Sequence, residues 1–258
     1  MSTAVLPAPV SSRGASSRPG LGRLVLVELR KMSDTRAGFW LLAGTALLTA
    51  AVAVIAGFEL PDEDATLVNF LAISLVPASV LLPVVGILLV TSEWSQRTAM
   101  ITFALVPHRS RVLVAKLLAG SALALVAFQI CLVVALLTTA LAGGSSDDTW
   151  SLSAALIGQA VVSITVPMLT GIGFGAVLLA SAPAIVLYFV LPTAFGILGS
   201  LHALEGVARW LDQSRTMEKL VEDTLSGTQW ARLGASVALW TLLPLVVGFW
   251  RVRRSDVR

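Results

Sequence analysis

The chain is short of the residues from which enzymes and disulfide-stabilised domains are built. Charged residues make up 13% of its 258 residues, against about 25% in a typical soluble domain. It has two histidines, His108 and His202, and one cysteine, Cys131, which exclude a zinc-type cluster and an intramolecular disulfide. We expect Cys131, inside an apolar run, to be a small packing residue. The remaining residues form no recognisable catalytic constellation.

A nucleotide-binding loop is also missing. The glycine-rich stretch 171–175 has no preceding strand and no following Gly-Lys-Ser, so it does not fit a phosphate cradle. Gly171 and Gly175 instead form a G-x-x-x-G step inside an apolar run, which favours the close approach of two helices. The chain cannot hydrolyse ATP through a Walker-type loop of its own.

The net charge is +3, but the basic residues flank apolar runs and form no long basic face, so we expect no nucleic-acid partner. Residues 1–20 are rich in Ser, Pro, Ala and Gly and lack an apolar core, unlike a signal peptide. We expect them to form a disordered cytoplasmic tail, and residues 251–258 a short basic one.

Long apolar runs dominate what is present, because 56% of the residues are hydrophobic. A membrane helix needs roughly 20 apolar residues to cross the hydrocarbon. The sequence therefore predicts an all-α integral membrane protein with one membrane domain over 21–250. The six expected spans are 38–58, 71–91, 112–141, 153–180, 184–201 and 231–250.

Residues 21–37 predict an amphipathic helix at the membrane interface. Its apolar face carries Leu21, Val25, Leu29 and Met32, with Arg23, Arg30 and Asp34 roughly opposite. Glu28 falls on the apolar side. It either reaches out to water or contacts a neighbouring subunit or the charged stretch 91–116, which we call the hinge.

The distribution of Lys and Arg sets the expected orientation. Six lie in the region through Arg36, four in the hinge and four after Trp250, which makes fourteen on one side against four on the other. The first two loops on the opposite side carry Glu59, Asp62, Glu63, Asp64, Asp147 and Asp148. Both termini are therefore predicted to be cytoplasmic.

The segment 202–230 is the longest on the predicted outer side. Its apolar residues recur at roughly helical spacing, which predicts one or two short amphipathic helices on the outer leaflet. Such helices could cover an exit path, or the segment could be an ordinary connecting loop.

No charged residue occupies the middle of a predicted span, where it would cost roughly 2.5–3.5 kcal/mol. This argues against a proton- or sodium-coupled transporter, which usually keeps buried carboxylates there. Milder polar residues do occur, and helix packing or a weakly polar path would explain them: Gln129, Gln159, Ser163, Thr165 and Thr170.

The hinge combines helix signals with charge. Ser92 and Glu93 are typical of a helix start, Trp94–Leu105 would form the helix, and Pro107 would end it. Arg109 and the basic residues that follow it return the chain to the membrane. A short charged helix between two spans suits insertion into a groove on a cytoplasmic partner.

In layout and motifs the chain resembles the permease subunits of ABC-2 type transporters. The resemblance is carried by Glu28-Leu29-Arg30-Lys31 and, in the hinge, by Ser92-Glu93, Arg97-Thr98, Pro107-His108-Arg109 and Arg111 through Lys116. It implies a coupling segment at 92–111 that touches a separate ATPase subunit. The implied contact residues are Glu93, Trp94, Arg97, Thr98, Pro107, His108, Arg109 and Arg111, with Glu28, Arg30 and Lys31 on the surface helix.

The same resemblance implies two paired permease chains, identical or similar, in the plasma membrane of a bacterium. ATP would bind to the partner ATPase, and this chain would carry no cofactor. The cargo would be a drug-like, antibiotic or lipid molecule. Two other functions stay open: a membrane-bound lipid-modifying enzyme, and a membrane anchor or immunity protein that does not transport.

Overall fold

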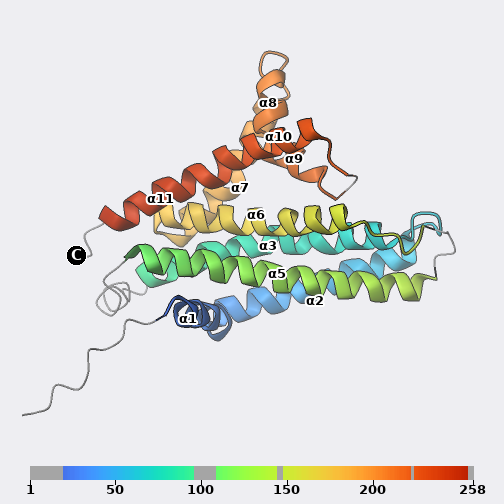
Figure 1. Cartoon of the computed structure of the whole chain (residues 1–258), viewed down its shortest axis with the longest axis horizontal. Helices are drawn as coiled ribbons and strands as arrows, with labels where there is room; N and C mark the ends of the chain where they lie inside the picture. Colours follow the sequence, from blue (N-terminus) through green and yellow to red (C-terminus); the bar gives the residue numbers. More distant parts are fainter. Residues whose placement is uncertain (1–19, 96–108, 144–147, 222–223, 255–258) are drawn as a thin grey trace, which may run out of the picture.

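The structure is a computed structural model that describes residues 20–95, 109–143, 148–221 and 224–254. These residues contain helices and no strands (Figure 1). In chain order the elements are α1 (Leu21–Asp34), α2 (Arg36–Glu59), α3 (Leu67–Ser95), α5 (Arg109–Ala142), α6 (Ala154–Leu178), α7 (Ser181–Leu198), α8 (Glu205–Leu211), α9 (Gln213–Glu218), α10 (Gly227–Val237), the π-helix η1 (Ala238–Leu242) and α11 (Leu243–Arg254).

Within the described residues six helical segments are long and apolar enough to cross a membrane, as the sequence predicts, so this is a multi-pass membrane protein. They are α2, α3, α5, α6, α7 and the continuous run from α10 through η1 to α11. The last span begins before its predicted start because Ser226 and Gln229 form a capping box at the beginning of α10.

The centre of the bundle is the seam between α3 and α6. Ile164, Met168 and Ile172 of α6 are fully buried there. A Cβ atom at Gly171 would lie 2.3 Å from the carbonyl oxygen of Pro83, and one at Gly175 would lie 3.1 Å from that of Ile87. The two backbones therefore touch, which confirms the packing interpretation of the G-x-x-x-G step.

Helix α7 is the least buried of the spans. Ala184 is the one residue of this helix that is buried. The helix follows α6 after a tight reversal, in which Leu179 adopts the left-handed conformation at φ 56° and its N–H bonds the carbonyl of Gly175 at 2.8 Å. Helix α7 then packs against α6, α3 and α9.

Between α7 and α10 lie the two short helices that the spacing of segment 202–230 predicts. We call α8 and α9, residues 205–218, the cap. Asp212 starts α9 by accepting the N–H of Ser214 at 3.0 Å and that of Arg215 at 3.4 Å. The indole of Trp240 in η1 donates to the carbonyl of Leu211 at 2.7 Å, so the cap is attached to the last span.

Helix α1, the last turn of α3, the first turn of α5 and the carboxyl end of α11 gather at one end of the bundle (Figure 1). We call this the hinge end. The described chain thus begins and finishes on the same side of the six spans, as an even number of crossings requires.

Candidate functional site

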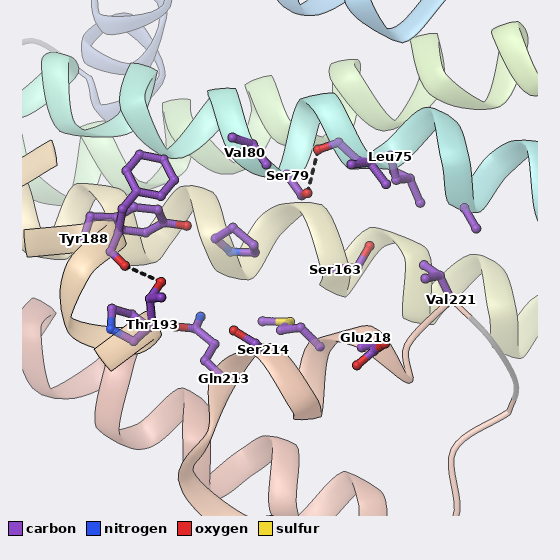
Figure 2. A pocket seen from close by; sticks show the side chains of 16 residues that line it. Leu75, Ser79, Val80, Ser163, Tyr188, Thr193, Gln213, Ser214, Glu218 and Val221 are labelled. Atoms are coloured by element: carbon purple, nitrogen blue, oxygen red, sulfur yellow. Dashed lines mark hydrogen bonds between the residues drawn. The ribbon is translucent and has the colours of Figure 1, made fainter. Parts of the chain in front are cut away.

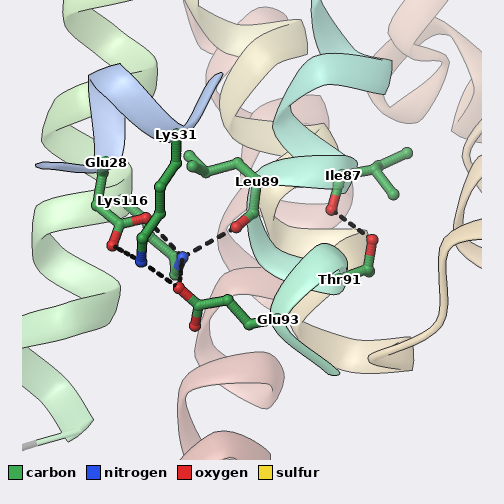
Figure 3. Close-up of polar contacts among 7 residues, drawn as sticks. All are labelled: Glu28, Lys31, Ile87, Leu89, Thr91, Glu93 and Lys116. Atoms are coloured by element: carbon green, nitrogen blue, oxygen red, sulfur yellow. Dashed lines mark hydrogen bonds and ion pairs between the residues drawn. The ribbon is translucent and has the colours of Figure 1, made fainter. Parts of the chain in front are cut away.

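Four charged side chains meet at the hinge end, and we call them the charge cluster: Glu28, Lys31, Glu93 and Lys116 (Figure 3). Lys116 Nζ lies 2.6 Å from Glu28 Oε2 and 3.0 Å from Glu93 Oε1. Lys31 Nζ lies 2.9 Å from Glu28 Oε1 and 2.6 Å from Glu93 Oε1. Each ammonium therefore bridges both carboxylates.

Three members of the charge cluster are almost completely buried. Glu28 is 4% exposed, Glu93 6% and Lys116 4%. Two positive and two negative charges balance, and Lys116 also donates to the carbonyl oxygen of Leu89 at 2.9 Å. This matters because a buried charge without a partner costs several kcal/mol. The buried members of the cluster thus compensate one another's charge.

Lys31 is the member that reaches solvent, with 37% of its side chain exposed. Burial by itself would lower the pKa of its ammonium. The hydrogen bond to Glu93 and the charges of Glu28 and Glu93 outweigh that effect and raise the pKa above its ordinary value. Lys31 is therefore fully charged at neutral pH and holds the outer edge of the cluster.

Sequence position explains how three elements can share this site. Glu28 and Lys31 are three residues apart, so they project from one face of α1. Glu93 lies in the last turn of α3, and Lys116 lies in the second turn of α5. The charge cluster therefore links α1 to α3 and α5, the two helices that flank residues 96–108.

Two expectations about these residues change. Glu28 does not reach out to water, because it pairs with Lys116 of the hinge, the other alternative that the sequence left open. Ser92 and Glu93 do not start a new helix, because α3 continues without a break to Ser95. Glu93 consequently points into the protein, and its side chain already has internal partners.

The other residues of the implied coupling segment are placed only in part. Trp94 and Arg111 are half-buried, Arg30 is exposed on α1, and Arg109 is the first residue of α5. Arg97, Thr98, Pro107 and His108 lie outside the described residues. Contact of this segment with an ATPase stays a prediction.

A cavity of about 430 Å³ lies between α3, α6, α7 and α9, and we call it the polar cavity (Figure 2). Leu75 and Val80 of α3 and Phe189 of α7 contribute apolar walls. Oxygen- and nitrogen-bearing side chains also line it: Ser79, Ser163, Tyr188, Thr193, Gln213, Ser214 and Glu218. Helix α9 of the cap forms one wall.

Three hydroxyl groups that line the polar cavity donate a hydrogen bond to a backbone carbonyl of their own helix. Ser79 donates to the carbonyl of Val76 at 2.8 Å. Ser163 does the same to Ala160 at 2.8 Å, and Thr193 to Phe189 at 2.7 Å. Their oxygens remain as acceptors toward the cavity, with the carboxylate of Glu218 exposed at its edge. The size and the mixture of walls suit an amphipathic molecule with hydrogen-bond donors.

The sequence marked two of the polar span residues correctly as packing residues. Gln159 donates to the carbonyl of Leu220 at 3.0 Å and accepts the N–H of Leu225 at 3.0 Å. Thr170 pairs with Thr241 of η1 at 2.6 Å. The prediction for Gln129 was wrong, because its side chain is exposed on α5. Sequence gave no signal for the polar cavity as a whole, since its lining comes from four separate elements.

The protein-family models and the curated proteins compared with this chain give no match. The function therefore has to be argued from the charge cluster, the polar cavity and the six spans.

Proposed function

We propose that this protein is the membrane-spanning permease subunit of an ATP-driven exporter, energised by a separate ATPase subunit. The observation that carries the proposal is the charge cluster, because it joins the helices on both sides of residues 96–108 to one another and to α1. A partner that grips this segment from the cytoplasm would pull on three elements at once.

The cluster supports this role by its mechanics. Glu93 and Lys116 link the hinge ends of α3 and α5, so a displacement of the connecting segment cannot move one span without the other. Helix α3 also meets α6 at backbone contact, which passes the movement to the centre of the bundle. Rigid elements with few adjustable contacts are what a mechanical coupling requires.

The polar cavity is the proposed place of the cargo. Its apolar walls and acceptor oxygens favour an amphipathic drug-like, antibiotic or lipid molecule, and Glu218 favours a cationic group near the edge. Helix α9 would act as a lid over the cargo, since it forms one wall of the cavity.

In this proposal the hinge end faces the cytoplasm of a bacterium, as the excess of Lys and Arg predicts. Two permease chains pair in the plasma membrane, and each binds one ATPase subunit. This chain holds no cofactor, and the ATP is bound by the partner.

The test is to purify the tagged chain from its own membranes, identify any ATPase that accompanies it, and reconstitute both in vesicles. We expect ATP-dependent movement of an amphipathic fluorescent cation. Arg97→Glu, in the proposed coupling segment, should lower both ATPase recovery and transport at least about tenfold, which is about 1.4 kcal/mol. Arg209→Glu, an exposed charge reversal in the cap, is the matched control and should leave ATPase recovery unchanged.

Undiminished ATPase binding and transport in the Arg97→Glu protein would remove the coupling role. Conversion of a lipid by the purified chain without ATP would favour the enzyme alternative. Binding of a partner protein without any transport in vesicles would favour the anchor or immunity protein.

A further inference from the structure

A second cavity, of about 330 Å³, lies on the other flank of α7, between α6, α7 and the run from η1 to α11. We call it the apolar cavity. Its lining is Phe174, Val177, Leu178, Leu187, Leu191, Phe195, Leu239, Trp240, Leu243, Pro244 and Val247. The single polar side-chain atom in this lining is the indole nitrogen of Trp240, which already donates to the carbonyl of Leu211.

The apolar cavity opens sideways between α7 and α11. Leu191 on α7 and Leu243 and Val247 on α11 line it and are also partly exposed on the surface of the bundle. These residues belong to membrane-spanning segments, so the opening faces the lipid. Water would find no hydrogen-bond partners in such a space, and an empty space would forfeit dispersion contacts.

One stripe of the last span continues from the apolar cavity to the hinge end. Leu243, Val247, Arg251 and Arg254 are spaced by three or four residues and therefore share a face of α11. Arg251 thus lies one helical turn beyond Val247, which lines the cavity, on the same face of α11. Trp250, exposed beside them, is typical of the level at which a span leaves the hydrocarbon.

Arg251 is positioned by the protein at this mouth. Its Nη1 donates to the carbonyl oxygen of Val177, in the last turn of α6, and Val177 is itself part of the cavity lining. A guanidinium carries five N–H donors in a planar fork, so further donors remain. Within the described residues no carboxylate forms an ion pair with Arg251.

We propose that the apolar cavity and Arg251 together bind a membrane phospholipid with an anionic headgroup. An acyl chain lies in the cavity against α7, and the phosphate pairs with the guanidinium of Arg251. The fork of an arginine matches phosphate oxygens, and the wholly apolar lining accepts a hydrocarbon chain but no polar molecule. The bound lipid fills the space beside α7 and fixes that helix against α6 and α11.

The site does not depend on the proposed transport activity, and it can be measured on the purified protein alone. The chain is stripped of lipid in detergent and titrated with phosphatidylglycerol, phosphatidylcholine, diacylglycerol of the same chains, or inorganic phosphate. Bound lipid is counted by native mass spectrometry, and the thermal midpoint is recorded. We expect phosphatidylglycerol to bind most tightly, diacylglycerol to bind weakly and inorganic phosphate to have no effect on the midpoint.

Two pairs of variants separate the headgroup from the chain. Arg251→Gln should weaken phosphatidylglycerol about fivefold, which corresponds to about 1 kcal/mol for one basic group at a membrane surface. Arg253→Gln removes the same charge from another face of the helix, where the guanidinium lies over the ring of Phe249, and should bind normally. Val247→Trp fills the cavity and should weaken the binding of every two-chain lipid. Val246→Trp changes the neighbouring residue, which is exposed and does not line the cavity, and should leave lipid binding unchanged.

Equal losses in Arg251→Gln and Arg253→Gln would show a general charge effect and overturn the headgroup assignment. Unchanged lipid binding by Val247→Trp would overturn the acyl-chain assignment. If that variant does not fold, Leu191→Trp fills the same cavity from α7 and tests the acyl-chain assignment in the same way.

Discussion

Helix α6 meets α3 and α7 in opposite ways. Toward α3 its glycines let the two backbones touch, and the charge cluster in turn links the hinge end of α3 to α1 and α5. Toward α7 it leaves a cavity on each flank of the neighbour, the polar cavity on one side and the apolar cavity on the other. The bundle therefore contains a rigid part that includes α1, α3, α5 and α6, and a loosely held span, α7.

This difference indicates which helices can be displaced at a low cost in free energy. Displacing α3 would break its backbone contacts with α6 and separate Glu93 from Lys31 and Lys116, whereas displacing α7 mainly changes the shape of two cavities. A cargo on one flank of α7 and a lipid on the other would compete for its position. The following predictions test whether the two parts differ as strongly in energy as they do in geometry.

The largest effect is expected for Lys116→Met in the rigid part. Of the ion pairs among the described residues, the substitution removes both that Lys116 makes with the buried Glu28 and Glu93, and breaking a buried ion pair costs about 3–5 kcal/mol. Thermal unfolding in detergent, followed by tryptophan fluorescence, measures the loss. Lys31→Met, whose ammonium is partly exposed, should lose clearly less. Equal midpoints for the two variants would mean that burial does not set the strength of the cluster.

Gly171→Ala should follow, with a loss of about 1–3 kcal/mol or more, because the new methyl group would collide with the backbone at Pro83. A backbone oxygen cannot swing aside as a flexible side chain can. Gly158→Ala, on the same helix with no atom within 4 Å, is the matched control and should be neutral or slightly stabilising. A neutral Gly171→Ala would contradict the close contact of α3 and α6.

Gln159→Leu should have a local effect of about 1–3 kcal/mol, because it leaves the carbonyl of Leu220 and the N–H of Leu225 without their partner. Hydrogen exchange at the amide of Leu225 should become faster, while the core of α6 keeps its protection. Gln129→Leu replaces an exposed glutamine and should leave this exchange unchanged. Unaltered exchange in Gln159→Leu would mean that the segment after α9 is held elsewhere.

The smallest effect is expected for Leu191→Ala on α7, below about 1 kcal/mol, since this side chain already borders a cavity and is partly exposed. Ile172→Ala, in the buried seam, should cost about 2–5 kcal/mol. Thermal midpoints of the two proteins give the comparison directly. Similar losses would show that α7 is held as firmly as the seam.

Local sequence features predicted much of the fold. Apolar length located all six spans, and the helical spacing of apolar residues in segment 202–230 predicted one or two short helices. Gly171 and Gly175 identified a packing surface, though not which helix would cover it. The hinge was recognised as unusual from its charge, but its boundary was misjudged, because Ser92-Glu93 has the composition of a helix start and lies in the last turn of α3.

The two candidate sites could not be assembled from the sequence. The charge cluster joins residues separated by as many as 88 positions. The position of Glu28 on the apolar side of its helix left contact with the hinge open, but did not identify Lys116 as the partner. Arg251 looked like one more basic residue of a cytoplasmic tail. Its position at the mouth of the apolar cavity depends on the contact of α11 with Val177 at the end of α6.

The sequence by itself determined that this chain enters a membrane, because hydrophobic transfer depends on the composition of each segment and scarcely on its neighbours. It also determined where helices can touch closely, since the absence of a side chain is a local property. Only the tertiary structure decided which charges become partners, which side chains line each cavity and that α7 is held loosely. Those properties depend on helices distant in the sequence packing side by side, and no single segment contains that information.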